Sequence, residues 1–464
     1  MALKTESHVT FHSSDRGLEK GFERLKRQAL HWVFEGYPVG DYYEAALPNR
    51  DAFCMRDASH QCTGGEVLGL SKHNKNMFLK FARSISDARD WCAHWEIDRF
   101  DRPCPVDHHS DQDFWYNLPG NFDMLDACLR MYLWTGDESY LTDKDLDYFY
   151  AQTMEAYINR WDSNGDGLPD RRAADSAGAT LTRRGVPGYD ESASIWNTLQ
   201  TATDLVASMA RAHISYAQIC KLMKRTEQAA IYHNRGEELV RRLNQDFYTD
   251  KLGFAKGLDF DGKLLYTSDT YSCDSHMLYW DAVPDIDRCN KLVNAYASEI
   301  EKVQIESLSH FPEILWRYGR NDSAMQSLWK LMDENLSRKE YPEASFCAIG
   351  AFATGLMGIS PNAASNTIRT ISGLVDTDWA ELAYIPVFGG EISVSHKACL
   401  VTQFSWDGPK PVIWQPAFHD DGKIMLNGAA LKTNKAINPF SGRPYVYAKI
   451  TVQPGETFEV KITN

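Results

Sequence analysis

The spacing of apolar residues changes once along this chain of 464 residues, near residue 375. Before that point apolar side chains recur every three or four positions, as in helices that bury one face. The first such stretch runs from Leu18 to Val33. After residue 375 apolar and polar residues alternate between Gly-containing turns, which is the pattern of half-buried strands in hairpins. The sequence therefore predicts a mainly α chain that ends in a small antiparallel β domain.

Further helices are expected along the first part of the chain. They cover 66–95, 119–135, 143–161, 194–216, 226–247, 286–300, 309–319, 322–336, 346–357 and 361–373. Short polar turns join several of them into hairpins, at Leu133–Glu138, Lys221–Thr226 and Arg317–Asp322. Helical hairpins in this number suit a closed toroid of two concentric helix rings, with loops at one end building the site. We expect the toroid at 1–378 and the β domain at 379–464.

Composition excludes some classes of partner. The chain is 43% apolar and 12% aromatic, which provides for a large core and argues against disorder. Its net charge of -14 argues against binding along a nucleic-acid backbone or an anionic membrane. No uninterrupted apolar run approaches the ~18 residues of a membrane-spanning helix.

No cofactor or metal site is expected from the motifs. The chain has no phosphate-binding loop and no dinucleotide fingerprint. Its ten cysteines form no Cys-x-x-Cys pair, so reduced thiols are expected. Asp162–Asp170 resembles the start of a calcium loop, but the twelfth position is Ala173, so a structural turn is expected. His60 and His108–His109 are interpreted as polar loop or helix-end residues. The first residues, Met1–His8, carry no apolar segment, which favours a cytoplasmic location.

The segment Gly188–Ser192 reads Gly-Tyr-Asp-Glu-Ser and places two acidic side chains beside an aromatic ring. It follows a charged, glycine-rich loop and precedes an amphipathic stretch. A carboxyl group at a helix entrance, shielded by a ring, can keep its proton near neutral pH, as a general acid must. Asp190 and Glu191 are therefore candidate acids.

A second candidate carboxylate is Glu343, which follows Tyr341-Pro342 and precedes an apolar helix rich in small residues. The dipole at a helix N-terminus favours the ionised form that a general base requires. Simple charge capping of the helix is the alternative role. Glu340 and Glu306 are further candidates for the base. Two carboxyl groups among many aromatic rings are what cleavage of a glycosidic bond requires.

Two other segments could bind a substrate. Arg56 and the adjacent Asp57 could hold two neighbouring hydroxyls, because arginine donates in a planar fork and aspartate accepts. A partly buried ion pair at a helix entrance is the alternative. In a loop before another helix, Asp113 could accept from a hydroxyl. The aromatic candidates for stacking on a sugar are Trp115, Tyr116, Tyr189 and Trp196.

These motifs resemble those of the six-hairpin (α/α)6-toroid glycosidases, a superfamily that includes glucoamylases, trehalases, processing α-glucosidases and α-L-rhamnosidases. Arg56-Asp57, followed by Ala58-Ser59, is similar to the Arg-Asp-Ser of glucoamylases and related α-mannosidases, where the pair holds the non-reducing sugar. Gly188–Ser192 resembles the Gly-aromatic-Asp-x-Ser of trehalases, whose Asp is the general acid. The resemblance points to Asp190, while Glu191 departs from the pattern and leaves the choice between the two open.

The resemblance implies an exo-acting, inverting glycoside hydrolase that removes a terminal sugar from an oligosaccharide or glycoside. The acid would protonate the leaving oxygen while Glu343 activates a water on the opposite face, with the carboxyl groups about 6.5–9.5 Å apart. Related folds also host phosphorylases, sugar epimerases and uronyl lyases. A non-catalytic carbohydrate-binding protein is the alternative from a different class.

Overall fold

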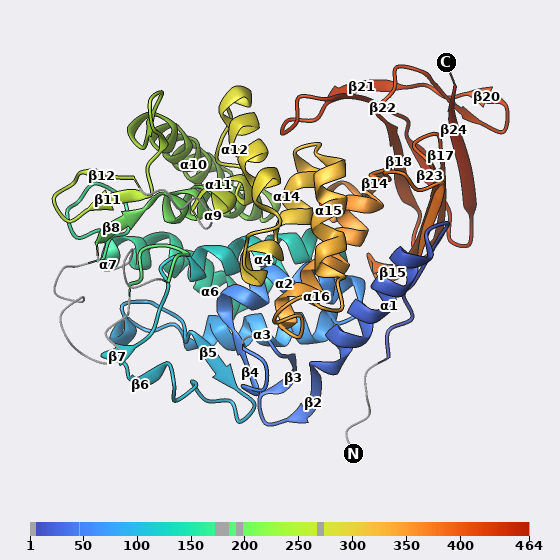
Figure 1. The fold of residues 1–464 in the computed structure, drawn as a ribbon. Helices are drawn as coiled ribbons and strands as arrows, with labels where there is room; N and C mark the ends of the chain where they lie inside the picture. The colour runs from blue at the N-terminus through green and yellow to red at the C-terminus, as the bar shows by residue number, and fades with distance from the viewer. Residues whose placement is uncertain (1–5, 46, 172–184, 192–197, 267–272, 464) are drawn as a thin grey trace.

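The computed structural model describes residues 6–45, 47–171, 185–191, 198–266 and 273–463. Helices dominate as far as Leu356, and strands dominate from Ser360 onward. The strands of the C-terminal part, in orange and red, lie to one side of the helical part (Figure 1). The change in periodicity along the sequence thus corresponds to a change in architecture, from helical to β-rich.

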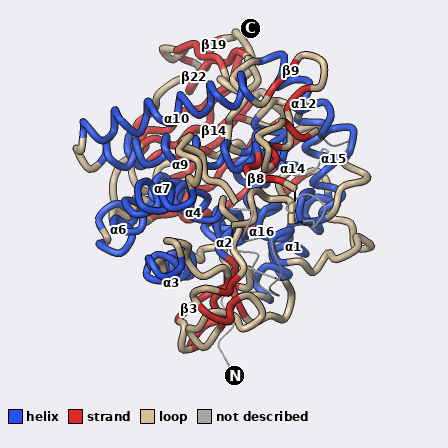
Figure 2. The backbone as a smooth tube through the Cα atoms, turned by 90° about the vertical axis from the view of Figure 1, so that its left-hand side faces the viewer, coloured by secondary structure: helices blue, strands red, loops and turns tan. Residues whose placement is uncertain are grey.

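Six largely buried helices of the described chain contact one another in sequence order, and the last returns to contact the first. They are α2 (Met55–Val67), α4 (Gly120–Thr135), α9 (Thr203–Leu222), α11 (Cys273–Tyr279), α14 (Phe311–Arg317) and α16 (Pro342–Ala351). Most residues of α4 and α16 are apolar or small, and both helices are buried on nearly every face. The contacts close the six helices into a ring. Of these helices, α2, α4, α9, α14 and α16 are labelled in Figure 2.

A second set of helices packs against the ring and buries a single stripe of side chains. It comprises α1 (Arg16–His31), α3 (Ser71–Ser84), α6 (Lys144–Gln152), α10 (Thr226–Asp246), α12 (Ile286–Glu299) and α15 (Asn321–Leu331). In α10 the buried residues Tyr232, Gly236 and Leu239 recur every three or four positions. This one-sided burial is the reason for the amphipathic pattern of the sequence.

Shorter helical segments complete the helical part. They are α5 (Ser139–Thr142), α7 (Ile158–Trp161), α13 (Ile305–Leu308) and the π-helical turns η2 (Thr153–Tyr157) and η4 (Phe352–Leu356). The three polar turns that the sequence predicts do join helices. Gly136 and Gly319 end α4 and α14 with φ of 70° and 75°, which glycine adopts without strain.

The C-terminal strands form two main sheets. The first has the order β1 (Thr10–Ser13), β15 (Trp379–Val387), β16 (Gly390–Lys397), β17 (Val401–Asp407), β24 (Thr457–Thr463), β19 (Lys423–Leu426), β20 (Ala429–Ala430). The second has the order β13 (Ser360–Asn362), β14 (Thr367–Ile371), β18 (Val412–Phe418), β22 (Pro444–Tyr447), β21 (Asn434–Ile437), and β23 (Ile450–Val452) also pairs with β18. Phe404 of the first sheet stacks on Trp414 of the second, with ring centroids 5.1 Å apart.

The helix expected at 361–373 is wrong. The segment forms β13 and β14, and β14 pairs in parallel with β18 while burying Ile368 and Thr370. The expected boundary at 378/379 also differs from the observed sheets, which begin at Ser360 and take in β1 from the N-terminal region. Both differences arise because strands distant in sequence pair with one another. The local spacing of apolar residues does not reveal such pairing.

Several small sheets lie within the helical part. They consist of β2 (Val33–Tyr37) with β3 (Gly40–Tyr43), β4 (Ala52–Cys54) with β5 (Glu96–Asp98), β6 (His108–Ser110) with β7 (Asp113–Phe114), β8 (Leu199–Ala202) with β11 (Gly257–Asp259) and β12 (Leu264–Leu265), and β9 (Tyr248–Thr249) with β10 (Gly253–Phe254). β4 leads directly into α2, and β8 leads into α9. α9 therefore begins at Thr203, later than the expected 194.

The ring depends on one close approach of backbones. A Cβ atom at Gly64 of α2 would lie 2.0 Å from the carbonyl oxygen of Phe346 in α16, so only glycine fits there. Cysteines with described side chains are all free, and most are buried. None of the described helices combines the length and the apolar character needed to cross a bilayer.

Candidate active site

The first turns of the ring helices bring ionisable side chains together in the interior. They are Arg56, Asp57 and His60 in α2, Asp123 in α4, Asp204 in α9, His276 in α11, His310 just before α14, and Glu343 in α16. We call His60, Asp123, His276, His310 and Glu343 the carboxylate–histidine cluster. Because helix N-termini carry partial positive charge, their convergence favours anionic groups at this end of the ring.

Glu343 is the buried anion of the cluster. Its Oε1 lies 3.1 Å from Nδ1 of His60 and 3.2 Å from Nε2 of His310. Burial alone would raise the pKa of Glu343, but His310 and His60 outweigh it and hold the pKa below its usual range. Glu343 is therefore kept ionised and oriented by two imidazoles, as a general base must be.

Three histidines surround this carboxylate. The rings of His60 and His310 are 4.5 Å apart in an edge-on arrangement, and nitrogens of both lie within 4.8 Å of a nitrogen of His276. Burial and the neighbouring His310 lower the pKa of His60 to about 3, so His60 is neutral at pH 7. Neutral imidazoles are also metal ligands, and this triplet is where a cation could be held. The sequence interpretation of His60 as a simple helix-end residue missed this position.

Asp57 and Arg56 extend the cluster toward the surface. Asp57 is buried and accepts a hydrogen bond of 2.6 Å from the hydroxyl of Tyr341. Burial, reinforced by the charge of Glu343, raises the pKa of Asp57 to about 6. The guanidinium of Arg56 lies 3.1 Å from Glu191 and over the rings of Trp95 and Tyr189. The guanidinium of Arg56 and the carboxylate of Asp57 thus provide a donor and an acceptor next to each other, close to Glu343.

The Gly188–Ser192 motif is built into the same cluster through its aromatic residue. The hydroxyl of Tyr189 donates to Asp123 and accepts from Nε1 of Trp280, while the Tyr189 ring stacks on His276 with centroids 3.7 Å apart. A Cβ at Gly188 would lie 2.4 Å from Oδ1 of Asp204, so the motif requires glycine there. The described part of the motif, Gly188–Glu191, is therefore held against the starts of α4, α9 and α11.

The two candidate acids lie at the outer edge of this arrangement. Asp190 is half-buried, and the side chain of Glu191 is 39% exposed. Glu191 accepts from Nδ2 of Asn117 at 2.9 Å as well as from Arg56. A chain of contacts thus runs from Glu191 through Arg56 and Asp57 to the surroundings of Glu343, so carboxylates 152 and 153 positions apart in sequence belong to one region.

The other predicted site residues have different surroundings. Tyr116 is fully buried, and its hydroxyl donates to Asn121, so its ring has no face available to a sugar in this structure. Trp115 is also buried, and Asp113 lies 3.1 Å from Nδ1 of His109 on a hairpin. Trp196 and Ser192 lie outside the described residues.

Neither alternative base joins the carboxylate–histidine cluster in the way that Glu343 does. Glu340 is exposed, and Glu306 pairs with Arg338. Both lie outside the first turn of α16, which is the segment that reaches His60 and His310. The geometry therefore favours Glu343 among the three.

Sequence reasoning missed Asp123, His276 and His310. Asp123 is fully buried, and burial raises its pKa well above the usual range, which favours the protonated form of this carboxyl. Its Oδ2 has no hydrogen-bond partner and lies 4.0 Å from Nε2 of His60. The signal that could have found Asp123 is an acidic residue in the first turn of a helix that is buried on nearly every face.

A buried ion network lies one to two turns further along the ring helices. Asp126 accepts from Arg130 at 2.9 Å and from Arg211 at 2.7 Å, and burial is outweighed by these charges, so the pKa of Asp126 falls to about 2. Arg211 also pairs with Asp281, which pairs with Arg317. This network ties α4, α9 and α14 together.

The calcium-like loop is a structural turn, as expected. The carboxylate of Asp162 accepts from the backbone N–H groups of Gly165 and Gly167, and Asn164 and Asp166 cap the following residues in the same way. The side-chain oxygens that a cation would need are engaged in Asx turns.

Comparisons with known proteins place the fold among carbohydrate-active structures. The chain is similar to a GH78 family rhamnosidase of Bacillus sp. GL1 (TM-score 0.62, 15% identity, 84% of this chain and 40% of that chain). It is also similar to a putative kojibiose phosphorylase from human microbiome (TM-score 0.60, 9% identity, 98% and 63%) and to a glycosidase in complex with glucose (TM-score 0.51, 13% identity, 74% and 98%).

These likenesses concern the fold alone, because the identities are low. The chain spans about half or less of the length of the rhamnosidase chains that it matches. No protein-family model matches the chain, and no curated protein does.

Proposed function

We propose that this protein is an exo-acting, inverting glycoside hydrolase whose helical part is a toroid of six helical hairpins. The observation that carries the proposal is Glu343, an ionised carboxylate at a helix N-terminus that two histidines hold in the interior of the helix ring. The structures with this fold include rhamnosidases and other glycosidases, which supports carbohydrate as the substrate class.

Glu343 is the general base of this proposal. A base that activates water has to be ionised and fixed in direction, and the imidazoles of His60 and His310 supply both conditions. Burial of Asp123 behind His60 raises the pKa of that carboxyl, which disfavours a second negative charge at the same point. The water attacks the anomeric carbon and gives a proton to Glu343 as the glycosidic bond breaks.

Asp190 is the general acid of this proposal. Glu191 is occupied by donors from Arg56 and Asn117, whereas an acid has to donate its own proton to the leaving oxygen. The adjacent Asp190 is half-buried in the same motif and is the position that the resemblance to the trehalase motif assigns to the acid. Arg56 and Asp57 hold hydroxyls of the terminal sugar, and Tyr189 packs behind them.

The function is tested by incubating the protein with a panel of aryl glycosides and unbranched oligosaccharides. We expect release of a single terminal sugar, and proton NMR of the first product should show the anomer opposite to that of the substrate. Retention of the anomeric configuration would contradict the mechanism. Binding of sugars without any release would instead support a carbohydrate-binding protein.

A second candidate is a sugar epimerase or isomerase on the same fold. The observation that favours it is the buried triplet of His60, His276 and His310, since such enzymes move protons with histidines. The structures of similar fold reported above are glycosidases and a phosphorylase, which is why we rank this candidate second. Conversion of a free sugar without hydrolysis of any glycoside would decide for it.

A further inference from the structure

A cavity lies at the opposite end of the helix ring from the carboxylate–histidine cluster. Its volume is about 440 Å³, within the roughly 300–1,000 Å³ of typical small-molecule sites. The ring helices contribute residues from their later turns, such as Thr63, Arg130 and Arg317, whereas the cluster uses their first turns. The second β sheet supplies the facing wall, with Arg369 and Tyr445.

Three arginines line this cavity, and they differ in their partners. Arg130 hydrogen-bonds Asp126, and Arg317 pairs with both Asp281 and Glu313, so the charges of these two are offset by carboxylates. Arg369 of β14 donates to the hydroxyl of Tyr445 at 3.1 Å. Across the described part of the chain no carboxylate pairs with Arg369.

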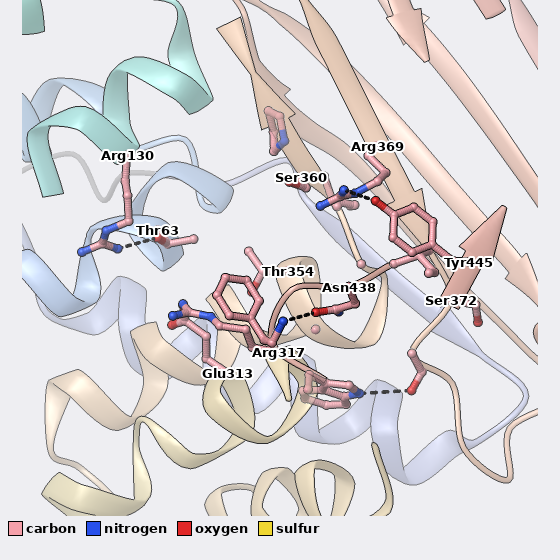
Figure 3. Close-up of a pocket in the computed structure, with 18 of the residues that line it drawn as sticks. Thr63, Arg130, Glu313, Arg317, Thr354, Ser360, Arg369, Ser372, Asn438 and Tyr445 are labelled. Atoms are coloured by element: carbon pink, nitrogen blue, oxygen red, sulfur yellow. Dashed lines mark hydrogen bonds and ion pairs between the residues drawn. The ribbon is translucent and has the colours of Figure 1, made fainter. Parts of the chain in front are cut away.

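The helix C-termini around the cavity carry partial negative charge, which would repel an anion. Arg317 lies in the last turn of α14 and counters that charge, and Arg130 lies in the C-terminal half of α4. Arg369 lies on β14 of the second sheet and pairs with no carboxylate of the described chain. Its positive charge is therefore available to a ligand. Figure 3 shows Arg369 beside Tyr445 and Ser360 on one side of the cavity, with Arg130 and Thr63 on the opposite side. The unpaired positive charge of Arg369 thus stands in a protein whose net charge is -14.

The rest of the lining suits a ring that carries hydroxyl groups. Thr63, Thr354, Ser360 and Asn438 offer hydroxyl and amide groups to hydrogen bonds. Half-buried Phe440 and buried Trp316 offer aromatic surface, on which the C–H face of a sugar can pack. Apolar rings with a few polar groups and one charged group are the usual composition of a site for a small ligand.

We propose that this cavity is a non-catalytic binding site for a monosaccharide that carries an anionic group, a carboxylate or a phosphate. Arg369 binds the anionic group with its planar fork, and the hydroxyl and amide groups bind the sugar ring. Glucose, as a neutral sugar, lacks the group that Arg369 recognises. The proposal does not depend on the hydrolase activity, because none of the residues that line the cavity belongs to the carboxylate–histidine cluster.

Isothermal titration calorimetry of the full chain with glucuronate, glucose 6-phosphate, glucose and inorganic phosphate tests the proposal. We expect saturable binding of one anionic sugar, at least about tenfold tighter than that of glucose or of inorganic phosphate. The choice between glucuronate and glucose 6-phosphate identifies the anionic group. Absence of saturable binding of both, or inorganic phosphate binding as tightly as the sugar phosphate, would overturn the proposal.

Variants locate the binding. Arg369→Gln should weaken it about tenfold or more, and Arg369→Lys should weaken it less, because lysine keeps the charge but loses the fork. Arg83→Gln, an exposed position on α3, is the matched control and should leave binding unchanged. Asp190→Asn should also leave it unchanged. Equal loss in Asp190→Asn would place the ligand in the other site and reject the proposal. If Arg369→Gln does not fold, as judged by circular dichroism, Arg369→Lys carries the test.

Discussion

His60, in the second turn of α2, contacts the first turn of α16, because its Nδ1 lies 3.1 Å from Oε1 of Glu343 across the interface of these helices. The contact needs the close approach of these helices that Gly64 permits. A packing feature of the ring thus sets the position of the proposed base. The predictions below separate the chemical role of this region from its structural role.

Glu343→Gln should lower kcat by about 10³-fold, because an amide cannot take the proton of the attacking water. The near-isosteric side chain can still accept hydrogen bonds from His60 and His310, so the fold should be retained in circular dichroism. Glu340→Gln, at an exposed position three residues earlier, is the matched control and should keep normal activity. Unchanged kcat in the first variant, measured by release of sugar from an aryl glycoside, would remove Glu343 from the mechanism.

Asp190→Asn should be far more harmful with poor leaving groups than with good ones. A dinitrophenolate leaves without protonation, so the loss of the acid matters little there, whereas an alkyl glycoside depends on it. Glu191→Gln should instead raise KM with every substrate, because it disturbs Arg56. If the dependence on leaving group appears in Glu191→Gln and not in Asp190→Asn, the two roles are reversed.

Asp126→Asn should destabilise the protein by about 3 kcal/mol, because it leaves Arg130 and Arg211 without the carboxylate that neutralises them in the interior. Urea unfolding followed by tryptophan fluorescence measures this change. Asp421→Asn is the control, since its pair with Lys435 is exposed and should contribute less than about 1 kcal/mol. Similar midpoints for both variants would show that the buried network adds no stability.

His396 should make the protein less stable in mild acid. Burial lowers its pKa to about 4, and its Nε2 donates to the carbonyl oxygen of Met357. Between pH 6.5 and 4 the unfolded chain binds a proton that the folded chain does not, so stability is lost as pH falls through this window, by about 3 kcal/mol at most.

His396→Gln should flatten the dependence on pH over this range in urea unfolding at several pH values. His233→Gln, at an exposed position on α10, provides the comparison and should keep the slope of the unchanged protein. The same slope in all three proteins would contradict this role of His396.

Chelation should leave the hydrolase activity unchanged, since the proposed mechanism uses Glu343 and Asp190 without a metal. Activity is measured before and after dialysis against EDTA. Loss of activity that zinc restores would mean that His60, His276 and His310 hold a cation, and the mechanism would have to be rewritten around it.

Much of the architecture is readable from local patterns. The helix from Arg16, the turns at Gly136 and Gly319, and the alternating strands after Trp379 follow from apolar spacing and turn residues, which act within a few positions. The expectation of a helix at Thr367–Ile371 is wrong. This strand forms by parallel pairing with β18, whose residues are about 45 positions away in the sequence, and local patterns do not show such a contact.

The candidate site divides in the same way. Arg56, Asp57, Asp190 and Glu343 could be proposed because each stands in a short motif whose residue types suit one kind of chemistry. His276 and His310 have no such motif. They become part of the site only because six helices start at the same end of a ring, which brings first turns from all parts of the chain together.

The amino-acid sequence by itself determined which segments are helical, which are extended, and which short motifs carry acids beside aromatic rings. These properties depend on side chains a few positions apart. The tertiary structure alone decided that His60 and His310 hold Glu343, that Asp123 is buried with its pKa raised, and that Arg369 faces a cavity without a carboxylate partner in the described chain. Burial and charge pairing at those positions arise from packing between distant segments, and no local pattern encodes them.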